Sequence, residues 1–330
     1  MAGFLTELHV KGYACLKDVK CALTPLHAFI GPNDSGKSTL LRVIQNLPGT
    51  RFPADTGVYA RLVDGSDLRI NYGGAGILVT LPGGRVMGLG EAQTHPQLRA
   101  ALSVRLATQH EQIQLVRLSA DSLRQSSQLI TQGQPLELVG RGTNLAGLYD
   151  ALRDRSIERF AAISTRVSDF FPSVKALGLR ATGAGQKVLA VTLVDGTEVL
   201  SGEMSEGLLY YLAFAILGEL QRPAAYLVEE PENGLHPSRI HDIIGMLRRI
   251  TEGPDGVQVL MATHSPLVVN ELRPEEVTVV TRDPVTGTHL ETINKTPHFA
   301  ERAKVYALGE LWLSYADGKE EAPLFDGEGR

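Results

Sequence analysis

The chain has 330 residues, 43% of them hydrophobic, which is enough to bury the core of one large domain or two ordinary ones. Its 32 basic and 37 acidic residues give a formal net charge of -5, so nucleic-acid binding would need a local basic patch rather than a chain-wide field. Two cysteines are too few for a disulfide framework, and the longest apolar run, Leu208 to Leu217, is too short to span a bilayer, so we expect a cytoplasmic protein without a membrane partner.

Two strands joined by a turn are predicted within residues 4–30, and this stretch ends in a short apolar strand, Leu26 to Ile30. A helix is predicted from Ser38 onward, because leucine and isoleucine recur there at helical spacing until Pro48-Gly49. Residues 56–90 alternate apolar or β-branched stretches with Asp-Gly, Gly-Gly and Pro-Gly-Gly turns. This alternation predicts an antiparallel sheet.

From about residue 91 to 175 the pattern turns helical, with Leu, Ile and Val three or four residues apart, and an inserted helical lobe is expected. Its nearly balanced charges are more typical of a solvated helix surface than of a DNA footprint. A hairpin around Asp195-Gly196 is predicted within residues 187–200.

The rest of the chain alternates between an apolar helix, a strand, a helix and a strand through His264, followed by a hairpin, a helix near residues 298–314 and a polar tail. Alternation of strands and helices favours parallel pairing. The expected fold class is therefore α/β, with a mainly parallel sheet, an N-terminal antiparallel β region and the inserted helical lobe.

A glycine-rich loop, G-P-N-D-S-G-K-S-T, lies between the strand that ends at Ile30 and the helix that follows, and it matches the pattern G-x-x-x-x-G-K-[ST]. Its two glycines let successive backbone N–H groups face phosphates, and the helix adds its positive end. Lys37 is predicted to reach the β- and γ-phosphates of ATP, and the Ser38 hydroxyl to ligate Mg²⁺. The predicted ATP-binding residues of this loop are Gly31, Pro32, Asn33, Asp34, Ser35, Gly36, Lys37, Ser38 and Thr39.

Two acids end the apolar strand of A-A-Y-L-V-E-E-P-E-N-G-L-H-P, and the proline after them cannot donate to a sheet ladder. Ligands of open α/β sheets bind outside the carboxyl ends of the strands, so both acids are expected beside the nucleotide. Glu229 is predicted to hold Mg²⁺ and Glu230 to orient and polarise the attacking water. For two acids taken alone, a solvated strand end is the alternative.

Four features stand in order along the chain: the hairpin before G-P-N-D-S-G-K-S-T, then M-S-E-G-L-L, then L-V-E-E-P-E-N-G-L-H-P, and finally M-A-T-H-S-P. On these features the chain resembles the ABC-type ATPase superfamily and, within it, the compact soluble heads related to the OLD, RecF and SMC proteins. The resemblance implies a P-loop NTPase head. It also implies a head-to-tail homodimer around two ATP molecules, each held by the phosphate loop of one subunit and the signature motif of the other.

Two candidates for the signature overlap in L-S-G-E-M-S-E-G-L-L. We favour Ser205, Glu206 and Gly207 over the more transporter-like L-S-G, because they directly precede the apolar helix and Ser205 can cap it. The resemblance also identifies His264 as the switch histidine that contacts the γ-phosphate. By the same resemblance, Asn233 begins the D-loop that touches the opposite subunit.

The chain departs from the transporter pattern at Glu229 and His236, where transporters carry Asp, and both changes favour the OLD-like branch. Tyr13 either stacks on adenine or packs in the core of the hairpin. OLD-type nucleases continue into a nuclease domain, and too few residues follow His264 here for one. Cleavage of nucleic acid is therefore expected to belong to a separate effector protein.

The expected function is a soluble ATPase that hydrolyses Mg-ATP at the dimer interface, with Lys37, Glu230 and His264 as catalytic residues. It would drive a DNA-maintenance or phage-defence complex, and direct DNA binding is left open. The alternatives are the ATP-binding subunit of a membrane transporter and an ATP-gated clamp or scaffold with little turnover. The whole chain would form one head, made of residues 1–90 with the phosphate loop, a helical insertion at 91–180, the other motifs at 181–314 and a polar tail at 315–330.

Overall fold

The computed structural model describes residues 4–47, 52–53, 56–63, 65, 67–71, 76–80, 86–88, 113–252, 256–296 and 299–316. The chain divides into two compact units. Unit 1 comprises Met1–Leu115, Pro223–Glu232 and Arg248–Arg330, and unit 2 comprises Val116–Arg222 and Asn233–Leu247. These boundaries differ from the ranges expected from the sequence. Residues 91–112 of the expected insertion and most of the expected tail lie outside the described residues.

One sheet of unit 1 is antiparallel, with the strand order β2-β1-β4-β5-β6-β7. The first two strands form the predicted hairpin, in which Val10 lies opposite Val19. The other four confirm the antiparallel sheet predicted for residues 56–90. The strands are β1 (Leu5–Tyr13), β2 (Leu16–Ala22), β4 (Gly57–Leu62), β5 (Asp67–Asn71), β6 (Gly76–Thr80) and β7 (Val86–Gly88).

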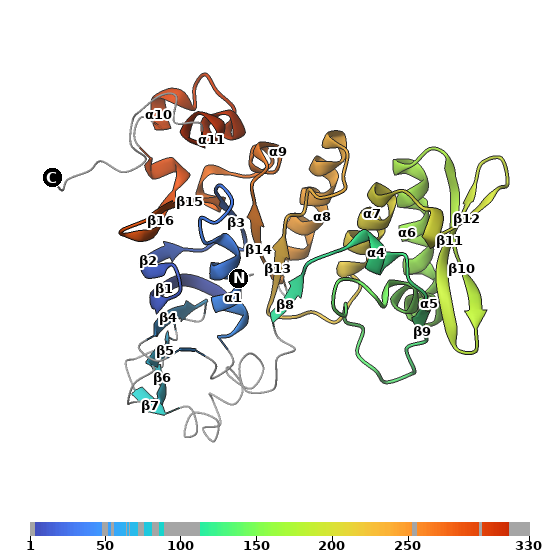
Figure 1. Cartoon of the computed structure of the whole chain (residues 1–330). Helices are drawn as coiled ribbons and strands as arrows, with labels where there is room; N and C mark the ends of the chain where they lie inside the picture. Colours follow the sequence, from blue (N-terminus) through green and yellow to red (C-terminus); the bar gives the residue numbers. More distant parts are fainter. Residues whose placement is uncertain are drawn as a thin grey trace. The chain divides into compact units, whose positions relative to one another are not determined.

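The second sheet of unit 1 has the order β16-β15-β3-β14-β13-β8 (Figure 1). Strands β15, β3, β14 and β13 pair in parallel, and β16 is antiparallel to β15, which confirms the mainly parallel sheet. Every residue of β3 is buried, as expected for a strand covered on both faces. The strands are β3 (Leu26–Ile30), β8 (Ile113–Val116), β13 (Ala225–Glu229), β14 (Gln258–Thr263), β15 (Val277–Asp283) and β16 (Gly287–Thr292).

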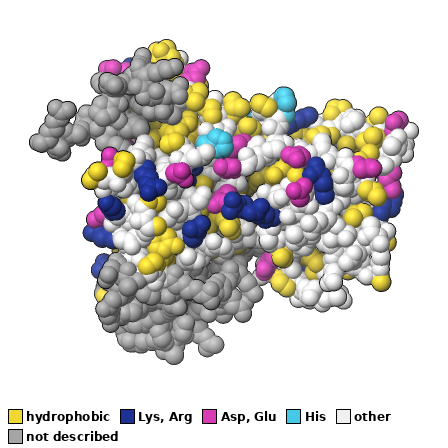
Figure 2. Space-filling view, in the orientation of Figure 1, with side chains coloured by type: hydrophobic (Ala, Val, Ile, Leu, Met, Phe, Trp, Pro, Cys, Tyr) yellow, Lys and Arg dark blue, Asp and Glu magenta, His cyan; other side chains and the backbone are white. Residues whose placement is uncertain are grey.

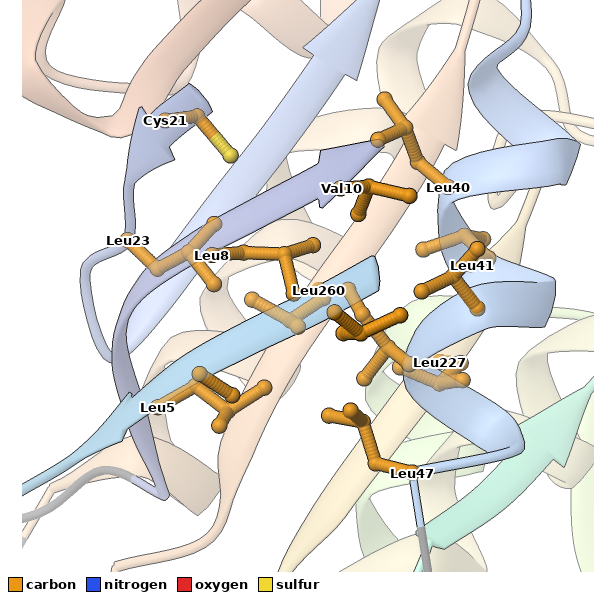
Figure 3. Packing of buried hydrophobic residues seen from close by; sticks show 14 of the residues in the cluster. Leu5, Leu8, Val10, Cys21, Leu23, Leu40, Leu41, Leu47, Leu227 and Leu260 are labelled. Carbon is orange, nitrogen blue, oxygen red and sulfur yellow. The ribbon is translucent and has the colours of Figure 1, made fainter. Parts of the chain in front are cut away.

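Helix α1 (Lys37–Gln45) packs against β13 and β14 of the parallel sheet, and its apolar side chains join the same buried cluster as those of β1 and β2. Figure 3 shows leucines of the helix facing leucines of both sheets. Burying each such leucine stabilises the fold by roughly 2 kcal/mol. The labelled residues of this cluster are Leu5, Leu8, Val10, Cys21, Leu23, Leu40, Leu41, Leu47, Leu227 and Leu260.

Tyr13 packs against this cluster, and its ring meets the ring of Phe52 edge to face at 5.7 Å between centroids. Of the two expectations for Tyr13, the structure shows the core contact.

The C-terminal part of unit 1 corrects one prediction. The single helix expected near residues 298–314 is two helices, α10 (Phe299–Arg302) and α11 (Leu308–Ala316). At the start of the second helix, the Glu310 carboxylate accepts a hydrogen bond from the backbone N–H of Ala307 at 2.9 Å. A Cβ atom on Gly309 would lie 2.2 Å from the carbonyl oxygen of Pro266, so glycine lets α11 approach α9 (Pro266–Asn270).

Unit 2 contains a small antiparallel sheet, β10-β11-β12 with β9 paired to β11, on which α5 and α6 pack. Strands β11 and β12 form the predicted hairpin. The elements are α4 (Ala120–Leu123), β9 (Ser127–Gln128), α5 (Leu145–Arg155), α6 (Ile157–Phe170), β10 (Val174–Gly183), β11 (Gln186–Leu193), β12 (Glu198–Leu200) and α7 (Glu206–Leu217). Helix α8 (Ile240–Thr251) begins in unit 2 and ends in unit 1.

The helical pattern expected up to residue 175 is therefore wrong in part. The segment between β9 and α5 has no regular structure, and the lobe includes β9 and the start of β10. Glycines at 133, 140 and 142 have positive φ values of 93°, 57° and 96°, which end any helix there.

Helix α7 is the apolar helix predicted from the sequence, and every residue from Leu208 to Leu217 is buried. The hydroxyl of Tyr149 on α5 donates to the carbonyl oxygen of Leu212 at 2.8 Å, which ties the two helices together.

No helix among the described residues is both long and apolar enough to cross a membrane. On the face shown in Figure 2, Lys and Arg side chains are interspersed with Asp and Glu, in keeping with the small net charge.

Candidate active site

The glycine-rich loop between β3 and α1 is held in a conformation that needs its glycines. Gly36 has a φ of 112° and Asp34 a φ of 65°, both in the left-handed region. A Cβ atom on Gly31 would lie 2.1 Å from the carbonyl oxygen of Val280, so a side chain at this position would displace β15. The loop therefore has the alternating backbone conformation that gathers N–H groups into an anion-binding concavity.

The β15–β16 hairpin braces the outside of this loop. Arg282 donates from its guanidinium to the carbonyl oxygen of Asp34 at 3.2 Å, and Thr288 donates from its hydroxyl to that of Ser35 at 2.8 Å. In a trans peptide the N–H points away from the carbonyl, so the N–H of Gly36 points away from Thr288.

Lys37, the first residue of α1, is 8% exposed. Its ammonium donates to the carbonyl oxygens of Gly31 and Pro32, both at 2.7 Å. Burial lowers the pKa of Lys37, and the negative charges of Glu230, Glu232 and Asp34 oppose this shift. The lysine thus lies in the electrostatic field of the acids that follow β13.

The strand register explains why these distant segments meet. Ile30 of β3 lies beside Thr263 of β14, and Ala262 lies beside Glu229 of β13. All three strands are parallel, so their carboxyl ends share one edge of the sheet. With about 4.8 Å between neighbouring strands, the backbones at Ile30 and Glu229 are roughly 10 Å apart.

Glu230 turns the chain sharply at this edge. Its φ is 49°, an uncommon value for a residue with a side chain, and its backbone N–H donates to the carbonyl oxygen of Ala262 at 2.8 Å. Its carboxylate Oε1 lies 3.5 Å from Nδ1 of His264, and both side chains are partly exposed. The structure therefore brings Lys37, Glu229, Glu230 and His264 together in unit 1, as expected from the sequence.

Glu232 is the residue of this site that sequence reasoning missed. Its Oε1 accepts hydrogen bonds from the Thr263 hydroxyl at 2.6 Å and from the backbone N–H of His264 at 3.4 Å. Its position as the third acid of E-E-P-E was the available signal. Its partners lie some thirty residues further along the chain, so only the fold reveals its contacts. Arg282 and Thr288 were missed for the same reason.

The oxygen atoms at the site suit Mg²⁺, which binds hard oxygen ligands and usually takes only one or two from the protein beside phosphates. Ser38 exposes its hydroxyl in the first turn of α1, and the carboxylate of Glu229 ends β13. The described residues contain no group of three or more acids, histidines or cysteines that could hold a metal alone. The Oγ of Ser35, buried inside the loop, has no hydrogen-bond partner in the described chain, which fits a loop that awaits a ligand.

The predicted signature and D-loop residues lie in unit 2. Ser205 is the N-cap of α7, and its hydroxyl accepts from the backbone N–H of Leu208 at 3.4 Å, which confirms the predicted cap. Gly207 approaches the D-loop, because a Cβ atom there would lie 3.5 Å from the carbonyl oxygen of Gly234. Glu206 and Asn233 flank this contact along the chain. The segments predicted to be the signature and the D-loop therefore pack against each other within one unit.

Two family models match the chain. Residues 99–270, more than half of the chain, match a family described as "AAA domain, putative AbiEii toxin, Type IV TA system". Residues 4–74 match the AAA ATPase domain.

A curated protein and several solved structures are also similar. Over 50 residues, 15% of this chain, the sequence is 44% identical to the OLD nuclease of Thermus scotoductus (strain ATCC 700910 / SA-01), and the match spans 10% of that protein. The SMC head domain from Thermotoga maritima matches with a TM-score of 0.53 and 14% identity, over 88% of this chain and 98% of that one. An SMC head bound to the C-winged helix domain of ScpA matches with a TM-score of 0.54 and 16% identity, over 87% and 97%. At these identities the structures establish a shared fold.

Proposed function

Because this chain belongs to the AAA domain family whose model spans residues 99–270 and has the fold of an SMC head, we propose that it binds ATP with Mg²⁺ and hydrolyses it. Its relation to the OLD nuclease, although limited to a short segment, supports the same class of ATPase.

One observation carries the proposal most directly. The parallel register of β3, β14 and β13 brings the loop of Lys37 and the segment of Glu230 and Glu232 to one sheet edge, although the two segments are nearly two hundred residues apart in the sequence. A triphosphate in the loop would place its terminal phosphate among these groups, where cations stabilise charge and a carboxylate can take a proton.

Each residue has a proposed role. Lys37 exchanges its two loop carbonyls for phosphate oxygens, which are stronger partners because both members of the pair are charged. Ser38 and Glu229 hold Mg²⁺, which neutralises phosphate charge when bound. Glu230 orients the attacking water and accepts its proton, and His264 contacts the γ-phosphate from beside Glu230.

We further propose a head-to-tail homodimer on ATP. The N-terminus of α7, with Ser205, Glu206 and Gly207, would face the γ-phosphate held by the loop of the partner, and Asn233 would contact the partner at the same interface. A helix N-terminus attracts anions, and Ser205 already orders this one as its cap.

The cellular role that fits these relatives is DNA maintenance or phage defence through a separate effector, which includes a nuclease among its candidates. The similarity to an OLD nuclease and to SMC heads bound to ScpA supports this role. A cytoplasmic location is part of the same proposal.

Steady-state phosphate release tests the activity. Lys37→Ala should weaken ATP binding about 10- to 100-fold, because it removes a charge-assisted contact to phosphate. Lys304→Ala removes an exposed lysine outside the site and should match the unchanged protein, which makes it the control for the same change of charge. If Lys37→Ala binds and hydrolyses ATP as well as the unchanged protein does, the loop takes no part in the reaction.

A further inference from the structure

Glu232 has no role in the proposed chemistry, yet its carboxylate is buried beside the reacting groups. The side chain is only 9% exposed, and a carboxylate is costly to bury unless hydrogen bonds compensate. Only Oε1 has such bonds, because Oε2 has no hydrogen-bond partner within the described chain. Because one of its two oxygens is not hydrogen-bonded, the buried carboxylate contributes little net folding stability. Its main effect is therefore on the residues that its hydrogen bonds hold in place.

Those bonds hold the turn that carries His264. The hydroxyl of Thr263 donates to Oε1 of Glu232 at 2.6 Å and accepts from the backbone N–H of Ser265 at 3.0 Å. The backbone N–H of His264 also donates to Oε1. Thr263 and His264 are thus bonded directly to one carboxylate oxygen and Ser265 indirectly through the Thr263 hydroxyl, and the short distance to Thr263 is typical of a charge-assisted bond.

The imidazole of His264 depends on this turn for its position. Its side chain is 51% exposed, so packing restrains the ring little. The ring nevertheless has Nδ1 at 3.5 Å from Oε1 of Glu230 and at 3.7 Å from Oε1 of Glu232. The backbone geometry of residues 263–265 sets where the ring lies.

We propose that Glu232 is a positioning residue that keeps His264 beside Glu230 by fixing the Thr263–Ser265 turn. This inference rests on the proposed ATPase function and deepens it. Glu230 and Glu232 stand two residues apart on one short segment, so the same segment carries both the acid that acts on water and the acid that holds the histidine.

Thr263→Val is the first test, because it keeps the side-chain shape and removes the hydroxyl. We expect kcat for ATP hydrolysis to fall about 10- to 100-fold, the range expected when a reacting group is misplaced by about an ångström, with KM for ATP within about threefold. Thr263→Ser restores the hydroxyl and should return kcat to within about threefold of the unchanged protein. If Thr263→Val and Thr263→Ser lose kcat to the same extent, the proposal is overturned.

A double-variant cycle separates positioning from general damage. If Glu232 acts through His264, Thr263→Val should cost nothing further in a His264→Ala background, because the group it positions is already gone. The same loss of kcat in both backgrounds would contradict the proposal.

Thr278→Val is the matched control, since Thr278 is also buried in this sheet and its hydroxyl also pairs with a side chain, that of His27 at 2.9 Å. It should lower thermal stability and leave kcat unchanged.

If Thr263→Val does not fold, Glu232→Gln replaces it, because the amide oxygen can accept both bonds. Glu232→Gln should then keep far more of kcat than Glu232→Ala, and equal losses would overturn the proposal.

Two different outcomes separate the ATPase function from the positioning role of Glu232. An unchanged protein that releases no phosphate would contradict the ATPase function itself. Normal turnover that Glu230→Gln blocks but Thr263→Val leaves intact would contradict only the role of Glu232.

Discussion

At the scale of single residues, Glu230 combines its proposed catalytic role with an unfavourable backbone. Its φ of 49° lies in the left-handed region, which costs a residue with a Cβ atom about 1–2 kcal/mol. Such strain is found at functional sites, where the surrounding structure enforces it. The backbone N–H bond to Ala262 enforces it here.

Glycine and alanine at position 230 should therefore differ in stability, although both remove the carboxylate. We expect Glu230→Gly to be more stable than Glu230→Ala by about 0.5–1 kcal/mol, because relief of the left-handed φ outweighs the extra entropy of glycine in the unfolded chain. Urea denaturation of the two variants measures the difference. An alanine variant as stable as the glycine variant would show that the backbone carries no strain.

His27 provides a pH test of the same sheet. It is fully buried in β3, with its ring nitrogens 2.9 Å from the hydroxyl of Thr278 and 3.0 Å from that of Thr24. Burial lowers the pKa of His27 from 6.5 to about 4, against the opposing charge of Glu276. As the pH falls from 6.5 toward 4, the unfolded chain takes up a proton that the folded chain refuses, so folding stability decreases in this window.

Between about pH 7 and pH 4.5 the unchanged protein should lose roughly 2–3 kcal/mol more unfolding free energy than His27→Gln, which does not titrate. Other groups that titrate in this window contribute equally to both proteins and cancel. Denaturation at the two pH values measures the difference. If the unchanged protein and His27→Gln lose the same unfolding free energy, His27 takes up its proton in the folded state.

At the scale of elements, Gln258 joins the two sheets of unit 1. This fully buried side chain at the start of β14 donates to the carbonyl oxygens of Leu5 and Thr24, at 2.8 and 3.0 Å. It accepts from the backbone N–H groups of Phe4 and Leu5, at 3.3 and 2.8 Å. All of its hydrogen-bonding capacity is thus used on the backbone around β1 and before β3.

Gln258→Met keeps the length of the side chain and removes these bonds. It should lower the unfolding free energy by about 3 kcal/mol or more, because each buried backbone group left without a partner costs about 1–3 kcal/mol. Thermal unfolding measures the loss. A change of less than about 1 kcal/mol would mean that β1 finds other partners or water.

Local patterns in the sequence predicted the elements whose causes are local. The loop before Lys37, the hairpin of β1 and β2 and the cap at Ser205 all follow from short motifs, and the structure has each of them. The break between α10 and α11 could not be predicted in this way. It depends on Gly309 meeting Pro266, more than forty residues away in the sequence.

At the scale of the whole molecule, the boundaries of the two units likewise could not be predicted from local patterns in the sequence. The chain passes between them after residues 115, 222, 232 and 247, and no composition change marks these points. One crossing directly follows Glu232, so Glu229, Glu230 and Glu232 belong to unit 1 and the predicted D-loop, which begins at Asn233, belongs to unit 2. The convergence of Lys37 with Glu230 was predictable, because a parallel sheet aligns the carboxyl ends of its strands.

Mixing two inactive variants tests the proposed dimer. Lys37→Ala disables the loop, and Ser205→Arg disables the signature. In a head-to-tail dimer of the two, one site combines both lesions and the other combines an intact loop with an intact signature. Random pairing should therefore restore about a quarter of the unmixed activity. A mixture no more active than its components would contradict the shared site.

The central claim is that Glu230 acts on the triphosphate held by the loop of Lys37. Single-turnover hydrolysis of ATP bound to excess protein with Mg²⁺ tests it most directly, because it separates chemistry from binding and product release. We expect Glu230→Gln to bind ATP as tightly as the unchanged protein and to convert it at least about 100-fold more slowly. Conversion at the unchanged rate would contradict it.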